Sequence, residues 1–223
     1  MAIARDSINN GTGGTGTSWT YSHTCSGEDR ILLVAGRGGG NSGDRVSTIT
    51  YNGKNLTRIG NSFAIGSSSE MSTLWYIINP DSGSHNVVIT LSSSDYSKWG
   101  SVSYTGVDQD NPINVSNTNS VQNSNSVSVS GMVTKDNSWL VGSVKNSIHQ
   151  LFAGTGTILT SNLGNEGSRM SDSNGVVASG SRSLAYTSSD AGDDWGMVLC
   201  AIAPVPIPGG RNPMFFNGGV SVG

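Results

Sequence analysis

Residues 48–59 read TITYNGKNLTRI, and this stretch decides the fold class. Apolar and polar residues alternate on both sides of Asn52-Gly53. This dipeptide is favoured in the two-residue turns of β-hairpins, because both turn positions take positive φ angles. We therefore predict two antiparallel strands joined at this turn, one within residues 46–52 and the other within residues 55–60.

Outward from this hairpin, short apolar and β-branched segments recur along the chain, separated by turn residues. No stretch of ten or more residues carries a helical period. The predicted strands are 17–24, 30–36, 46–52, 55–60, 71–78, 85–91, 98–106, 126–131, 138–144, 149–156, 182–188 and 194–203. Many short strands with such turns are typical of sandwiches and barrels, so we expect an all-β antiparallel sandwich of about 12 strands without substantial helix.

Composition excludes several classes of partner. The chain has 223 residues, 35% of them hydrophobic and 12% charged, with a net charge of −3. Its Lys and Arg residues are scattered singly, without the basic stripe that neutralises phosphates, so we expect no nucleic-acid partner. No apolar stretch is long enough to cross a bilayer, and residues 1–14 lack the apolar core of a secretory signal. We expect no membrane partner and synthesis in a host cytoplasm.

The chain divides into a body and an arm. We predict one β-sandwich domain over residues 1–204, with a long surface loop at 157–181. Residues 205–223 continue a proline-rich run and form an extended C-terminal arm. The large apolar residues of this arm are Met214, Phe215 and Phe216. We expect these three residues to dock, either on their own domain or on a neighbouring subunit.

No pattern predicts a catalytic, cofactor or metal site. Residues 11–16 match the letters of a dinucleotide fingerprint, but a strand-like segment follows where that fingerprint needs a helix N-terminus. A serine triad would need a histidine beside a serine and a carboxylate, and no G-x-S-x-G elbow is present. Calcium could bind clustered carboxylates, but we interpret these clusters as solvated turns. The histidines are His23, His85 and His149, and the clustered carboxylates are Asp108, Asp110, Asp190, Asp193 and Asp194.

The tryptophans are the candidate sugar-binding residues, because an exposed indole can stack on a sugar ring. Trp75 and Trp139 adjoin leucine, and we expect them in the core. Trp99 and Trp195 follow polar turns, and we expect partial exposure, which makes them the candidate glycan platform.

The two cysteines, Cys25 and Cys200, lack the spacing of a zinc site. Cys200 lies in the apolar run MVLCAIA, which favours burial. We interpret both cysteines as small buried hydrophobes.

The order of the motifs adds a resemblance. The most specific segments are LWYIINPDSG (74–83) and GVDQDNPI (106–113), preceded by EDRILLVAG (28–36) and followed by DWGMVLCAIA (194–203). This order resembles a family of β-sandwich modules found in phage virion proteins and in repetitive bacterial surface proteins, over residues 17–203. The resemblance implies a jelly-roll or concanavalin-like sandwich and no catalytic residues.

We therefore expect a non-enzymatic structural protein on the outside of a phage particle, either a capsid decoration protein or a fibre or spike subunit. Its partners would be other virion proteins, such as the major capsid or tail protein. It would also bind further copies of itself, because edge strands invite pairing. The alternative is a carbohydrate-binding surface module of the adhesin or lectin kind. Neither function implies a cofactor.

Overall fold

The computed structural model describes residues 2–37, 39–40, 43–64, 70–147, 151–160 and 168–206. These residues form eighteen strands, paired antiparallel, and no helix. The predicted all-β class is confirmed. The strand number exceeds the prediction partly because several strands have only two residues. These are β4 (Gly39–Gly40), β5 (Gly43–Asp44), β7 (Lys54–Asn55) and β15 (Thr157–Ile158).

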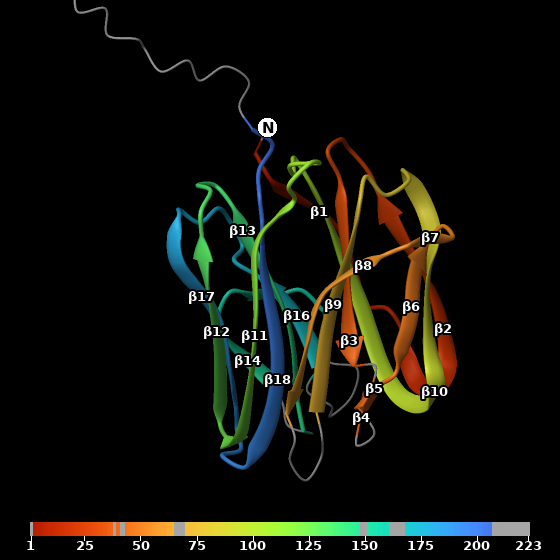
Figure 1. The fold of residues 1–223 in the computed structure, drawn as a ribbon, viewed down its shortest axis with the longest axis vertical. Helices are drawn as coiled ribbons and strands as arrows, with labels where there is room; N and C mark the ends of the chain where they lie inside the picture. The colour runs from red at the N-terminus through yellow and green to blue at the C-terminus, as the bar shows by residue number, and fades with distance from the viewer. Residues whose placement is uncertain are drawn as a thin grey trace, which may run out of the picture.

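The larger strands lie in four layers, seen edge-on in Figure 1. Layer 1 contains β2 (Gly13–Cys25), β6 (Val46–Tyr51), β7 and the first half of β10 (Gly83–Thr105). Layer 2 contains β1 (Ala4–Asn9), β3 (Ile31–Arg37), β8 (Thr57–Ala64), β9 (Glu70–Ile78) and the second half of β10. Layer 3 contains β11 (Ile113–Ser124), β13 (Trp139–Asn146), β15, β16 (Ser168–Asp172) and β18 (Asp193–Ile202). Layer 4 contains β12 (Ser126–Val133), β14 (Leu151–Thr155) and β17 (Gly180–Ser188).

Strand β10 belongs to two layers. Its residues 83–91 pair with β2 and β6, whereas residues 98–105 pair with β3 and β1. The register with β2 shifts between Thr90 and Asp95, where the strand passes from one layer to the other. Layers 1 and 2 therefore close around a shared core and form one sandwich.

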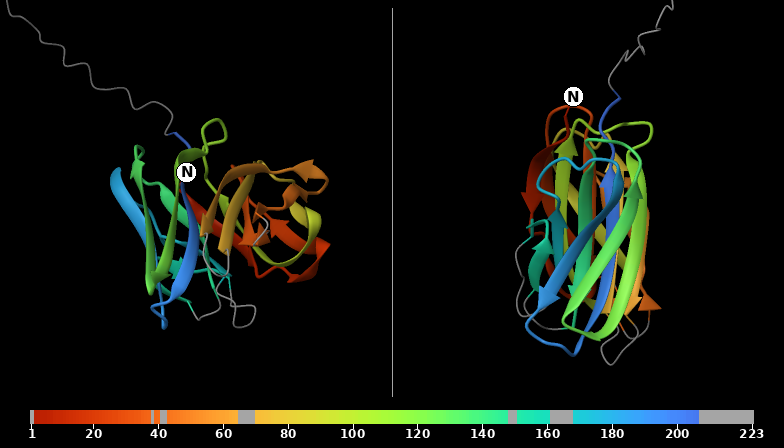
Figure 2. Two further views of the ribbon diagram at one scale, coloured as in Figure 1. Left: turned by 60° about the horizontal axis from the view of Figure 1, so that its bottom comes forward. Right: turned by 90° about the vertical axis from the view of Figure 1, so that its left-hand side faces the viewer.

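Three hydrophobic cores separate the four layers. In β3, Leu32 and Val34 enter the core between layers 1 and 2, whereas Ile31 and Leu33 enter the core between layers 2 and 3. Strand β18 is likewise buried on both faces, between layers 2 and 4. Strands buried on both faces read as continuous apolar runs, which accounts for ILLVAG and MVLCAIA. Two sandwiches are thus stacked back to back, as the left view of Figure 2 shows.

The hairpin at Asn52-Gly53 is confirmed at its turn. Both residues have positive φ, 48° and 75°, and Tyr51 faces Lys54 across the strands. The second strand is shorter than predicted, because only β7 pairs with β6. At Leu56, which is buried in the first core, the chain leaves layer 1 and continues as β8 beside β9 in layer 2.

Among the strands longer than two residues, β1, β11 and β16 lie where none was predicted. Residues 168–172, within the predicted surface loop, form β16 and are largely buried. The Asn- and Ser-rich residues 113–124 form β11, whose side chains join two layers. The Asn117 and Asn119 amides donate to the carbonyls of Ser130 and Ser128 on β12, each at 2.8 Å. These bonds close the open edge between layers 3 and 4.

Candidate functional site

The structure assembles a Ser-His-Ser-Asp chain inside the first sandwich. Ser101 Oγ lies 2.8 Å from Nδ1 of His23, and Ser103 Oγ lies 3.0 Å from Nε2. Ser103 donates to Asp6 Oδ2 at 2.8 Å. Because the Ser103 proton is used on Asp6, Ser103 accepts from Nε2–H, and Nδ1 accepts from Ser101. Strands β1, β2 and β10 are tied together by this chain.

This arrangement differs from a hydrolase triad in order and in access. A serine lies between the histidine and the carboxylate, whereas a triad places the carboxylate directly on the histidine. His23 is 1% exposed, and Ser101 and Ser103 are fully buried. Burial lowers the pKa of His23 to about 4, so its ring is neutral at pH 7. The Ser-His-Ser-Asp series of hydrogen bonds holds strands β1, β2 and β10 in register. His149 lies outside the described residues.

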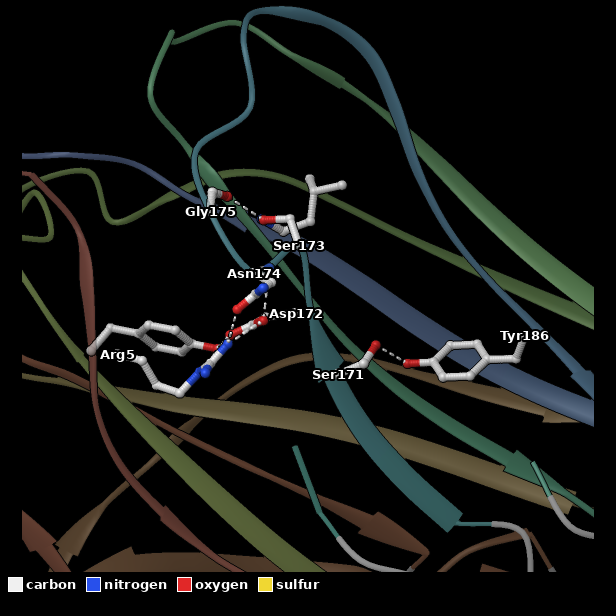
Figure 3. A network of polar contacts seen from close by, with 9 residues as sticks. Arg5, Ser171, Asp172, Ser173, Asn174, Gly175 and Tyr186 are labelled. Atoms are coloured by element: carbon white, nitrogen blue, oxygen red, sulfur yellow. Dashed lines mark hydrogen bonds and ion pairs between the residues drawn. The ribbon is translucent and has the colours of Figure 1, made fainter. Parts of the chain in front are cut away.

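A second polar network joins the two sandwiches (Figure 3). Arg5 on β1 forms a bidentate pair with Asp172 on β16, with bonds of 3.0 and 2.8 Å. The Tyr104 hydroxyl of β10 donates to the same carboxylate at 2.8 Å. The guanidinium also lies 5.8 Å from the ring centroid of Trp139. Asp172 is fully buried, so layers 2 and 3 are fixed together by a buried carboxylate on layer 3 whose partners Arg5 and Tyr104 come from layer 2.

The expected glycan platform is wrong. Trp99 is 2% exposed and Trp195 is fully buried. Trp99 faces Gly36 across β10 and β3, where the missing side chain leaves room for its ring. Trp195 packs in the core between layers 3 and 4 and donates from Nε1 to Ser124 O at 2.8 Å. Trp75 is buried as predicted, while Trp139 is half-buried.

The interpretation of the carboxylate clusters as solvated turns is wrong for Asp108, Asp193 and Asp194, which are buried and accept hydrogen bonds from protein donors. Asp108 accepts from the backbone amides of Asp110 and Asn111 at 3.0 Å and from Lys135 Nζ at 2.9 Å. The Lys135 bond and the two amides hold its pKa below the usual range. Asp193 accepts from the Asn146 amide, and Asp194 accepts from the Asn123 backbone. Within the described ranges no three potential metal ligands gather.

Both cysteines are free and fully buried. Cys25 lies in the core between layers 1 and 2, and Cys200 lies in the core between layers 2 and 3. Their interpretation as small buried hydrophobes is confirmed.

The GVDQDNP motif forms backbone hydrogen bonds with the C-terminal end of the body. The backbone of residues 106–112, named here the exit clamp, forms three hydrogen bonds with the chain that follows β18. Asp108 N donates to Ala203 O at 2.9 Å, Ala203 N donates to Pro112 O at 2.8 Å, and Val205 N donates to Gly106 O at 3.0 Å. The chain therefore leaves the body at one fixed point. Residues 207–223, with Met214, Phe215 and Phe216, lie outside the described residues.

An apolar hollow of about 680 Å³ lies at this point. Ala2, Val176 and the segment Pro204–Pro206 supply its apolar wall, and Lys135 and Asp136 lie among its polar lining. Val176 is 55% exposed, so its side chain is accessible in this wall. Its loop is held by Val177 N, which donates to Ser138 O at 2.7 Å. We call this site the exit hollow. No periodic pattern predicts it, because its walls come from four separate segments.

A polar hollow of about 460 Å³ lies on layer 1. It is lined by Thr50 and Asn52 near the hairpin and by Ser84, His85 and Asn86 at the start of β10. His85 is half-buried, with its ring edge-on to Tyr51 at 5.6 Å, and lies near the predicted strand end. This surface offers hydroxyl and amide groups without an exposed aromatic ring among its lining residues.

Among the described residues there is no helix long and apolar enough to span a membrane. Comparison with known proteins finds no match to a protein-family model, to a curated protein or to a solved structure.

Proposed function

We propose that this chain is a non-enzymatic structural protein on the exterior of a phage particle, as a capsid decoration protein or a fibre or spike subunit. The observation that carries the proposal is the fastened C-terminal exit. Three backbone hydrogen bonds anchor the chain at residues 203–205, directly before an arm that contains Met214, Phe215 and Phe216. Because the start of the arm is anchored to the body, an arm bound to a neighbouring subunit would hold the two bodies in a defined relative position.

The body supports this role by its construction. Its buried polar groups link strands and layers, as the His23 chain and the Asp172 network do. Its outermost faces are rich in hydroxyl groups. In layer 1 the exposed positions of β2 are Thr15, Thr17, Ser18, Thr20, Ser22 and Thr24, and in layer 4 those of β12 include Ser126, Ser128 and Ser130. Such faces stay hydrated, which suits a rigid spacer on a particle surface.

The arm predicts self-association that can be measured. Light scattering on the purified full chain should give a defined oligomer, and deletion of residues 207–223 should lower the mass while the β-sheet circular dichroism persists. Mass spectrometry of purified particles from the source phage should then find the chain among the particle proteins. A monomeric full chain, together with its absence from purified particles, would contradict the proposal.

A second candidate function is carbohydrate binding, and the polar hollow on layer 1 favours it. Asn52, Ser84 and Asn86 present amide and hydroxyl groups of the kind that bind sugar hydroxyls. A glycan array should then give hits that Asn86→Ala weakens and that Ser128→Ala, on the far layer, leaves unchanged. An array without hits would remove this candidate.

A further inference from the structure

The exit hollow has the chemistry of a binding site for large apolar side chains. Ala2, Val176 and Val205 present aliphatic groups to it, and Pro204 and Pro206 add two ring faces. Its volume of about 680 Å³ lies in the range of ligand pockets in proteins. Burial of an apolar side chain in such a site is favourable in proportion to the area removed from water.

We propose that the exit hollow binds Met214, Phe215 and Phe216 of a second copy of this chain. The inference rests on the proposed assembly role and names the surface that receives the arm. The three residues are the only consecutive large apolar side chains in residues 205–223. The arm and the hollow are different surfaces, so the contact gives a reciprocal dimer, a closed ring or an open filament, according to the rotation between neighbouring copies.

Charge favours the same pairing. Arg211 is the only charged side chain within residues 205–223, three positions before the apolar trio. Asp136 is an exposed carboxylate in the lining of the hollow. The other charged side chain of the lining, Lys135, forms an ion pair with Asp108 at 2.9 Å. A docked trio would therefore bring Arg211 toward a carboxylate and not toward a free cation.

The proline spacing favours a second copy over the arm's own hollow. Prolines occupy positions 204, 206 and 208, and such runs adopt an extended helix of about 3.1 Å per residue. The first two prolines of the run, Pro204 and Pro206, line the hollow, so an extended run would lead away from it. Return of the arm's own trio would then require a reversal of the chain, which would order additional residues. A neighbour's trio needs no reversal.

Cysteine crosslinking between singly substituted full-length chains tests the pairing. One protein carries Val176→Cys, the other carries Phe215→Cys, and the two are mixed under mild copper-phenanthroline oxidation. The native cysteines do not interfere, because both are fully buried. We expect a disulfide-linked heterodimer on a non-reducing gel. The matched control replaces Val176→Cys by Phe152→Cys, on layer 4 and 47% exposed, and should give at least tenfold less heterodimer.

The doubly substituted chain Val176→Cys/Phe215→Cys separates the two routes. A crosslinked monomer from this chain, with no heterodimer in the mixture, would show docking within one copy and overturn the proposal. Equal crosslinking at Phe152→Cys would overturn it as well. If deletion of residues 207–223 lowers the oligomeric mass but neither experiment crosslinks Val176→Cys, the arm assembles on another surface. The assembly role then stands and the exit hollow is the wrong site.

Val176→Asp gives an independent readout without oxidation. A carboxylate in the apolar wall should weaken self-association at least tenfold by light scattering. Phe152→Asp should leave the mass unchanged. An unchanged mass for Val176→Asp would contradict the proposal.

Discussion

Tyr104 and Asp172 face each other across the boundary between the two sandwiches, with the hydroxyl donating to Oδ2 at 2.8 Å. They lie on β10 and β16, and the same carboxylate accepts both bonds from Arg5. Desolvation and the nearby carboxylate raise the pKa of Tyr104 well above its usual value, so it stays a donor. The hydrogen bond therefore adds a directional contact to the apolar packing between layers 2 and 3.

Replacing Asp172 should therefore destabilise the whole stack. Asp172→Asn removes the charge that Arg5 and Tyr104 address, and we expect a loss of about 2–4 kcal/mol in unfolding free energy, reduced by the partial exposure of Arg5. The matched control is the surface pair Lys54–Asp81, where Asp81→Asn should lower the unfolding free energy far less, because solvent screens both charges. Urea denaturation measures both, and equal costs would contradict the assigned role.

His23 should make the protein sensitive to mild acid. Its pKa falls from 6.5 to about 4 through burial, so the unfolded chain binds the proton at a higher pH than the folded chain. The contribution of neutral His23 to the unfolding free energy is therefore fully present above pH 6.5 and declines as the pH falls towards 4. The difference of 6.5 − 4, about 2.5 units, corresponds to about 3 kcal/mol.

The carboxyl groups affect stability at a lower pH than His23 does. Asp6 has a lowered pKa, so its stabilisation is present above its ordinary value of 3.8 and is lost only below it. Denaturation between pH 7 and pH 4.5 should thus isolate the histidine effect. His23→Asn should flatten this dependence whatever its stability at pH 7, whereas His85→Asn should keep it. An NMR titration placing the His23 pKa near 6.5 would contradict the prediction.

Gly106, the first residue of the exit clamp, should not tolerate a side chain. It has φ of +71°, and a Cβ there would collide with the carbonyl of Ala2. Gly53 has a similar φ of +75° but open space around it. We expect Gly53→Ala to cost about 1–2 kcal/mol from backbone strain alone. Gly106→Ala should cost about 1–3 kcal/mol more because of the collision. Equal shifts in thermal unfolding would refute the distinction.

The cysteines should be unreactive in the folded protein. Burial raises the pKa of both Cys25 and Cys200, which removes the thiolate that reacts with disulfide reagents. Ellman's reagent should label neither residue under native conditions and both in 6 M guanidinium. Rapid labelling of one thiol in buffer would show that its core opens.

Local patterns predicted those elements whose side chains alternate or form a continuous apolar run. The alternation of β6 and the apolar run of β18 are such patterns, and both strands were found, whereas the second strand of the hairpin was shorter than predicted. Strand β16 has only Met170 as a large apolar residue, and its place depends on Arg5, which is 167 positions away from Asp172. No local signal encodes a bond over that distance. The predicted exposure of Trp99 was wrong for a similar reason, because Gly36 on another strand leaves the space in which the Trp99 ring is buried.

The candidate sites were less accessible to sequence reasoning than the fold. The His23 chain joins β1, β2 and β10, and the exit hollow joins segments near residues 2, 136, 176 and 205. Both depend on which strands become neighbours. The motif GVDQDNP was noticeable in the sequence, but its role as a clamp needed the partner residues 203–205.

Ala2 and Pro206 both line the exit hollow, so the two ends of the described body lie close together. A polypeptide that carried several such bodies in series would therefore enter and leave each body on the same side. The bodies would then project sideways from the connecting segments and would not follow one another end to end. The connecting segments would set the length of such a polymer, and the bodies would set its width.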